Sequence, residues 1–66
     1  MMNLRFKGKS DLSFEHNNIY RAKKFHDKDF GDGYAIFDEG DDWYWYDNDF
    51  VKENFDILKE VNNDNN

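Results

Sequence analysis

The sequence predicts an all-β fold, a small and strongly bent barrel of five short strands with one helical turn before the last strand. Phe, Tyr and Trp make up 20% of the 66 residues, although 36% are charged, and disordered chains are poor in aromatic residues. Short stretches of alternating apolar and polar residues are separated by clusters of Gly, Asp and Asn, which is typical of strands joined by turns. Since a single hairpin is only marginally stable in water, we expect the sheet to close or nearly close on itself.

Alternation with a period of two places the expected strands along the chain. They cover residues 2–7, 19–25, 34–37, 42–46 and 55–60. Turns are expected at 8–11, 16–18 and 38–41, and the segment 27–33, with two Gly and three Asp, is expected to be a loop or the end of a wide hairpin. A chain of 66 residues holds one domain at most. We therefore assign residues 1–60 to a single barrel domain and the Asn-rich residues 61–66 to a disordered C-terminal tail.

The segment after the fourth expected strand begins with residues that cap helices. The side chains of Asp47, Asn48 and Asp49 can accept hydrogen bonds from free backbone N–H groups, and we expect one helical turn over residues 50–54. A full helix over residues 48–61 is the alternative. Its apolar face would be broken and several of its residues have weak helix propensity, which favours the single turn.

Three segments carry a resemblance to a known group of proteins. They are KGKSDLSF (residues 7–14), NNIYRAKKF (17–25) and GYAIFDEGDDWYWYDNDF (33–50). With them the chain resembles a family of small, functionally unassigned proteins of low-GC Gram-positive bacteria and their phages. The resemblance implies an SH3-like five-stranded barrel that extends nearly to Leu58, and it supplies no catalytic residue. The chain departs from the family pattern in a shorter acidic turn, in the absence of Pro after the fourth strand, and in a longer segment at 47–54.

The run Trp43–Tyr46 is the segment best suited to bind a partner. Successive residues of a strand point to opposite faces, so the two Trp share one face and the two Tyr share the other. A two-residue turn at 39–40 would pair Ile36 with Trp43 and turn the Trp face to the core, whereas a turn one residue longer would reverse both faces. The resemblance favours the longer turn, which leaves Trp43 and Trp45 partly exposed.

Charge is unevenly distributed along the chain. Residues 1–26 carry six basic and two acidic side chains, whereas residues 27–56 carry two basic and eleven acidic ones, within a net charge of −6. We therefore expect a small acidic, non-catalytic module that binds another protein through an exposed aromatic and acidic face, where rings supply buried area and charge supplies steering. The residues expected to contact the partner are Trp43, Trp45, Asp41, Asp42, Asp38, Asp47 and Asp49.

The alternative function is an inhibitor that imitates nucleic-acid phosphates and occupies a nucleic-acid-binding protein. The carboxylates standing in for phosphates would be those of Asp38, Asp41, Asp42, Asp47 and Asp49. Binding by such a mimic weakens steeply with salt, whereas binding by an aromatic face does not. Direct binding of nucleic acid by this chain is disfavoured, because Arg21, Lys23 and Lys24 form too small a basic cluster.

No sequence pattern points to catalysis, a cofactor or a metal ion. The chain has no Cys, which excludes thiolate sites and fits a reducing, cytoplasmic location. His16 and His26 lack a further ligand at zinc spacing, and residues 27–38 lack the Gly and Glu positions of a calcium loop. The longest apolar runs have four residues, too few to cross a membrane. We expect a monomer or a weak homodimer without a cofactor.

Overall fold

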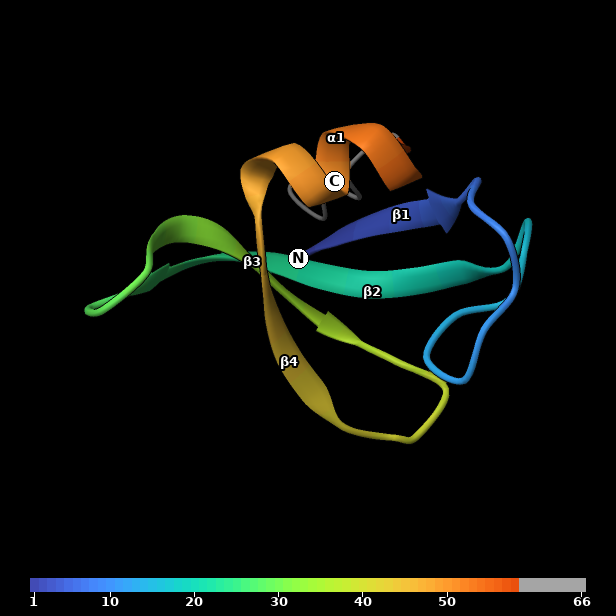
Figure 1. The fold of residues 1–66 in the computed structure, drawn as a ribbon, viewed down its shortest axis with the longest axis horizontal. Coiled ribbons are helices and arrows are strands. Elements are labelled where there is room, and N and C mark those ends of the chain that lie inside the picture. Colours follow the sequence, from blue (N-terminus) through green and yellow to red (C-terminus); the bar gives the residue numbers. More distant parts are fainter. Residues whose placement is uncertain (59–66) are drawn as a thin grey trace, which may run out of the picture.

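A computed structural model of the protein describes residues 1–58 of the 66. The elements in chain order are β1 (Met2–Phe6), β2 (Ile19–Asp27), β3 (Gly31–Phe37), β4 (Trp43–Asp47), α1 (Asn48–Asn54) and β5 (Phe55–Ile57). The five strands form one antiparallel sheet in the order β4-β3-β2-β1-β5 (Figure 1). The prediction of a mostly β fold with five strands and a helical segment before the last one is confirmed.

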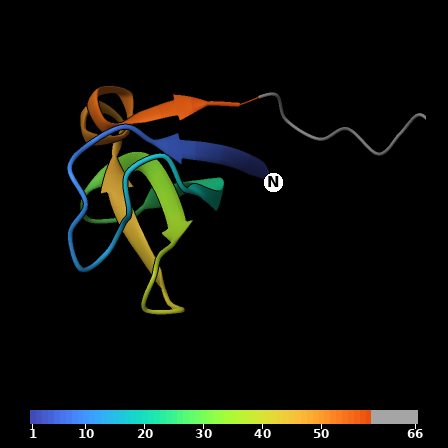
Figure 2. The ribbon, with the colours of Figure 1, turned by 90° about the vertical axis from the view of Figure 1, so that its right-hand side faces the viewer.

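The expected closure of the sheet into a barrel is not observed. β4 and β5 each pair with a single neighbour and form the two edges of an open sheet within residues 1–58. α1 follows β4 directly and leads directly into β5, and the turned view shows the helix between the end of one edge strand and the start of the other (Figure 2). With only three residues in β5, the helix rather than a strand ladder spans the distance between the edges.

The core lies on the inner face of the curved sheet and is completed by a residue from outside it. Phe14, in the connection between β1 and β2, is 1% exposed. Its ring lies 5.0–5.4 Å, between centroids, from the rings of four residues on the sheet, Phe6, Tyr20, Tyr46 and Phe55. The other members of the buried cluster are Leu4, Ala22, Ile36 and, from α1, Val51. Phe14 thus fills the space on the inner face of a sheet that does not close on itself.

Residues 27–33 form the end of a hairpin, the second of the two expected forms, and β2 and β3 extend into this segment. Asp27 pairs with Gly31 at the tip of the hairpin. The Asp27 carboxylate accepts the backbone N–H groups of Asp29 and Phe30 at 2.8 and 3.0 Å, and Gly31 has a φ of +91°. An Asp side chain and a Gly in the left-handed region make a compact turn, so residues typical of a loop here close a longer hairpin.

The helical segment is longer than one turn and shorter than the alternative helix. α1 has seven residues, about two turns, and the Asp47 carboxylate caps it by accepting the Phe50 N–H at 2.7 Å. The helix ends at Asn54, because Phe55 is extended and begins β5. A helix running on to residue 61 is therefore wrong. The last strand also ends earlier than expected, at Ile57, and residues 59–60 of that strand and the predicted tail at 61–66 lie outside the described residues.

The turn between β3 and β4 has the longer of the two expected forms. Phe37 pairs with Trp43 and Ile36 with Tyr44, so the strand pair begins one residue later than a two-residue turn at 39–40 would allow. Asp41 has a φ of +60° in this turn, a conformation that Asp tolerates better than most residues. Since Ile36 is fully buried in the core, this register puts the Tyr side chains of β4 on the inner face and its Trp side chains on the outer face.

Candidate functional site

The outer face of β2, β3 and β4 carries a group of aromatic side chains. We call it the outer aromatic patch and define it as Phe25, Phe30, Phe37, Trp43 and Trp45. Phe25 and Phe37 lie an odd number of positions from the buried residues Ala22 and Ile36 of the same strands, so they point to the opposite, outer face. The two Trp pair with Phe37 and Ala35 and therefore share that face. Phe30 joins them from the turn of the β2–β3 hairpin, and its ring stacks on that of Trp45 with a centroid distance of 5.5 Å.

Two small residues of β3 make room for the indole of Trp45. Gly33 and Ala35 point to the outer face, and Ala35 pairs with Trp45. A Cβ atom added at Gly33 would lie 2.6 Å from Nε1 of Trp45 and 2.4 Å from the backbone oxygen of Tyr46, closer than carbon approaches such atoms. The indole therefore lies across Gly33, with Phe30 on its other side.

The patch is only partly shielded from solvent. Phe30 is 74% exposed and Phe25 is 47% exposed, while Phe37 and both Trp are half-buried. Nε1 of Trp45 is buried and donates to no acceptor within residues 1–58. A buried donor without an acceptor costs on the order of 1–3 kcal/mol, which a Phe or Leu at the same position would avoid.

The charges that lie over the rings of the patch are positive. The guanidinium of Arg21 lies 5.3 Å from the centroid of the Phe37 ring, and the ammonium of Lys23 lies 5.0 Å from that of Trp43. Both arrangements have the geometry of cation–π contacts. The acids expected beside the Trp pair, Asp41 and Asp42, directly precede Trp43, and the rings themselves are covered by basic side chains of β2.

The predicted acidic residues lie at the two ends of β4 rather than on the patch. Asp41 and Asp42 are exposed in the turn before the strand, and Asp47 and Asp49 are exposed where the strand passes into α1. Asp38 is separate from them: it is 6% exposed and accepts the Gly40 N–H at 2.9 Å. Its carboxylate faces its own turn, and its role as a contact residue stays a prediction.

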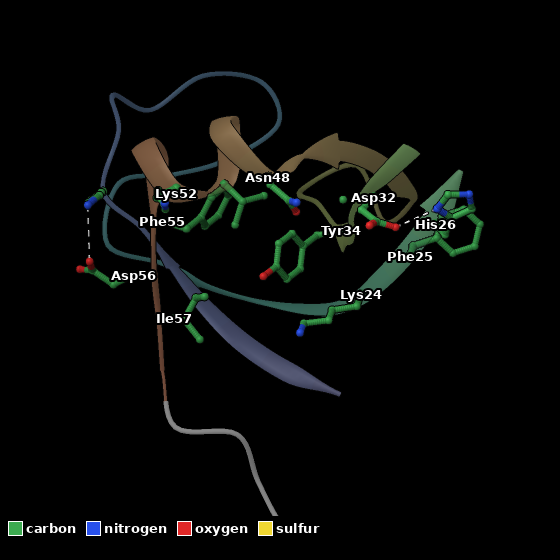
Figure 3. A pocket seen from close by; sticks show the side chains of 13 residues that line it. Lys24, Phe25, His26, Asp32, Tyr34, Asn48, Lys52, Phe55, Asp56 and Ile57 are labelled. Carbon is green, nitrogen blue, oxygen red and sulfur yellow. Dashed lines mark hydrogen bonds and ion pairs between the residues drawn. The ribbon is translucent and has the colours of Figure 1, made fainter. Parts of the chain in front are cut away.

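A pocket of about 790 Å³ opens on the inner side of the molecule, between the β2–β3 hairpin, α1 and β5 (Figure 3). Tyr34 lies in its middle, with Lys24 on one side and Lys52 on the other. An ion pair of Lys7 with Asp56 at 3.6 Å neutralises part of its charge, and Nδ1 of His26 lies 2.8 Å from the Asp32 carboxylate. The pocket is a weakly basic groove, and its lining holds no Ser or Cys that a base could activate.

Two tyrosines on the inner face have raised pKa values. Burial raises the pKa of Tyr20, and the hydrogen bond from its hydroxyl to the Glu39 carboxylate raises it further. The same hydroxyl accepts the Glu15 N–H at 2.7 Å. Burial also raises the pKa of Tyr46, with a further contribution from the negative charge of Asp38. Both groups hold the structure together in their neutral form.

Residues 1–58 contain no group of three His, Asp or Glu side chains placed to hold a metal ion. His26 meets Asp32 alone. No helix in this part of the chain is long and apolar enough to span a membrane.

Sequence reasoning missed five residues as parts of the site, namely Phe25, Phe30, Phe37, Arg21 and Lys23. The available signal was the pair of small residues that alternate with Tyr34 and Ile36, since small side chains on one face of a strand leave space for a large ring from the next. No protein-family model, curated protein or solved structure matches this chain. The resemblance to the Gram-positive and phage family stays a prediction.

Proposed function

We propose that the protein is a small non-catalytic interaction module that contacts a partner protein with the outer aromatic patch. The observation that carries the proposal is the gathering of five aromatic side chains on a solvent-facing surface of the sheet, opposite the core. Aromatic residues and Arg are enriched in the centres of protein interfaces. Contiguous apolar surface of this kind on a small protein usually marks a contact site.

Two further features of the patch support the proposal. Trp45 buries its indole N–H without an acceptor, although Trp in a purely structural position usually finds a partner for it. Arg21 and Lys23 lie over aromatic rings while remaining exposed, so each can keep its ring contact and also meet a carboxylate or carbonyl of a partner. The acids at the ends of β4 would steer the approach and exclude wrong partners.

The proposal extends to the fold and the location. We infer that the open sheet is a variant of the SH3-like barrel, the fold that the family resemblance implies, and that α1 occupies the gap between β4 and β5. The absence of Cys supports function in the reducing cytoplasm. The expected oligomeric state is a monomer or a weak homodimer, without a cofactor.

A second candidate function is the phosphate mimic that inhibits a nucleic-acid-binding protein. Its support is the exposure of Asp41, Asp42, Asp47 and Asp49 along one edge of the sheet. The burial of Asp38 removes one of the five carboxylates on which that idea was built. The basic side chains over the patch also weaken the negative field on the neighbouring face.

Affinity capture from a lysate of the source organism separates the two functions. The baits are the wild type, Trp43→Ala, and the matched control Ile57→Ala, which truncates an apolar side chain that is 59% exposed at the other edge of the sheet. We expect a partner that withstands moderate salt, is lost with Trp43→Ala and is retained with Ile57→Ala. Retention of a DNA- or RNA-binding protein that elutes as salt rises, equally from all three baits, would favour the mimic and contradict the proposal.

A further inference from the structure

β4 is an edge strand without the usual protection against pairing. It has five residues, WYWYD, with neither Pro, Gly nor a basic residue among them. Natural proteins blunt exposed edges with short strands, Lys, Pro or bulges, because an open edge is a template for another strand. The other edge strand, β5, is three residues long. The long, aromatic edge of β4 is therefore the one open to an added strand.

The register shows which backbone groups of β4 are free. Asp38 donates its N–H to the Asp42 carbonyl at 3.0 Å, and bonded pairs alternate along an antiparallel ladder. The next bonded pairs are then Ile36 with Tyr44 and Tyr34 with Tyr46, so the backbone groups of Trp43 and Trp45 point away from β3. The Asp42 side chain accepts the Trp43 N–H at 2.9 Å. No backbone hydrogen bond from a turn or loop in residues 1–58 reaches Trp45.

The acids at both ends of β4 indicate what kind of strand can be added. Asp41 and Asp42 precede the strand, Asp47 is its last residue, and Asp49 follows in α1. The five residues between Asp42 and Asn48 span about 17 Å. An antiparallel second copy centred on Trp45 would bring the acids of one end against those of the other. Like charges placed opposite each other are destabilising, so the edge selects against a second copy of this chain.

We propose that β4 accepts an extended segment of the partner protein as a sixth strand, one with an apolar centre and a Lys or Arg at each end. Backbone groups of Trp45 and the Trp43 carbonyl supply the ladder hydrogen bonds, and alternate side chains of the segment continue the outer aromatic patch. The basic ends of the segment meet the acids at the ends of β4. This inference rests on the proposed function and specifies the mode of binding and the chemistry of the partner.

The test uses the full chain and the peptide KKVTVTVKK, which has the proposed pattern. Its controls are the acidic peptide EEVTVTVEE and a copy of the basic peptide with an N-methyl group on the central valine. We expect the basic peptide to shift the backbone amide signals of Trp43 and Trp45 in NMR spectra and to slow hydrogen exchange of the Trp45 amide. N-methylation, which removes one ladder donor, should weaken binding by about tenfold, and the acidic peptide should not bind.

Charge selection is tested with Asp42→Asn and Asp47→Asn. Asn keeps the side-chain acceptor that each Asp offers to a backbone N–H, so these changes remove charge while keeping the local hydrogen bonds. Each change should weaken binding of the basic peptide several-fold at low salt. The matched control Asp29→Asn, in the exposed turn of the β2–β3 hairpin, should leave binding unchanged.

Several outcomes would overturn strand addition. They are failure of the basic peptide to bind, equal binding by its N-methylated copy, and formation of a dimer through β4, seen as concentration-dependent slowing of Trp45 amide exchange. The proposed function has a separate readout, since lysate capture that depends on Trp43 would stand even if the peptides show that the edge is not used. If the basic peptide binds but no partner is captured in a way that depends on Trp43, the outer aromatic patch is contradicted as the contact surface.

Discussion

Tyr20 joins three segments of the chain through one hydroxyl group. Its side chain is 6% exposed in the core. The hydroxyl donates to the Glu39 carboxylate and accepts the Glu15 N–H, and Glu39 in turn donates its own N–H to the Ser13 carbonyl at 2.9 Å. The acidic turn between β3 and β4 is thereby tied to β2 and to the β1–β2 connection, which carries the core residue Phe14. A Phe at this position would fill the same space without these hydrogen bonds.

We therefore predict that Tyr20→Phe lowers the free energy of unfolding by about 1–2 kcal/mol, because it leaves the partly buried Glu15 N–H without its acceptor. Urea unfolding followed by circular dichroism measures the change. The control is Tyr44→Phe, since Tyr44 is 54% exposed, and it should leave the midpoint nearly unchanged. Equal midpoints for both variants would show that the hydroxyl network adds nothing to stability.

Alkaline pH provides a second test at the scale of single residues. The pKa values of Tyr20 and Tyr46 are raised above 10.0 in the folded protein, so the folded state favours the neutral phenols. Their contribution to stability is fully present below pH 10.0, the unfolded value, and is lost as pH rises through the raised folded values. Urea midpoints should fall above about pH 10, and less steeply in Tyr20→Phe. A flat profile up to pH 12 would contradict the burial of these hydroxyls.

At the scale of elements, β3 shows why a strand can have different requirements on its two faces. Ile36 packs into the core, while Gly33 and Ala35 on the opposite face leave space for the indole of Trp45. The alternation of apolar residues predicted β1 and the first half of β2 correctly, because one face of each strand is buried there. It could not predict the continued pairing of residues 27–33, where Asp and Gly are typical of loops and the pairing depends on the neighbouring strand.

Gly33→Ala should destabilise the protein by about 1–3 kcal/mol, the cost of overpacking at a site where backbone cannot easily move. The new methyl group would meet the Tyr46 backbone oxygen at 2.4 Å. Gly40→Ala is the matched control, since its Cβ would meet only the Asp38 carboxylate, at 3.3 Å. Thermal unfolding of both variants measures the difference. A Gly33→Ala variant as stable as Gly40→Ala would mean that the indole does not lie across β3.

The two faces of the β3–β4 hairpin should also differ in their response to truncation. Ile36→Ala should cost about 2–5 kcal/mol, because it opens a cavity in the core. Trp43→Ala should cost less, since Trp43 is half-buried on the outer face and its ring contacts there are with Phe37 and Lys23. Urea midpoints of the two variants test the order. The reverse order would place the Trp face in the core and remove the proposed contact surface.

At the scale of the whole molecule, the chain combines a net charge of −6 with an outer aromatic patch over which two basic side chains lie. Sequence reasoning could predict that Trp43 and Trp45 share a face and that the longer turn exposes them, because both follow from strand geometry. It could not predict the positions of Arg21 and Lys23 over the rings, which depend on the register of β2 against β3. Nor could it separate Asp38, buried in its own turn, from the exposed acids around it.

The openness of the sheet was also beyond the reach of the sequence. The resemblance and the number of strands favoured closure, but closure requires pairing between the edge strands β4 and β5, and the chain between them forms α1 and leaves only three residues for β5. Instead of a closing pair of strands, α1 and Phe14 cover the inner face. The result is a molecule with one long free edge, β4, beside its most aromatic surface.

Photo-cross-linking in a lysate of the source organism tests the central claim, that the outer aromatic patch is the contact surface, most directly. The probe is Phe30→p-benzoylphenylalanine, because Phe30 is the most exposed ring of the patch at 74% and tolerates a larger aromatic group. The control carries the same group at Ile57, on the inner side at the other edge of the sheet. The account predicts a defined protein adduct from the Phe30 probe and none from the control. An adduct from the Ile57 position alone would contradict it and move the contact surface to the groove on the inner side.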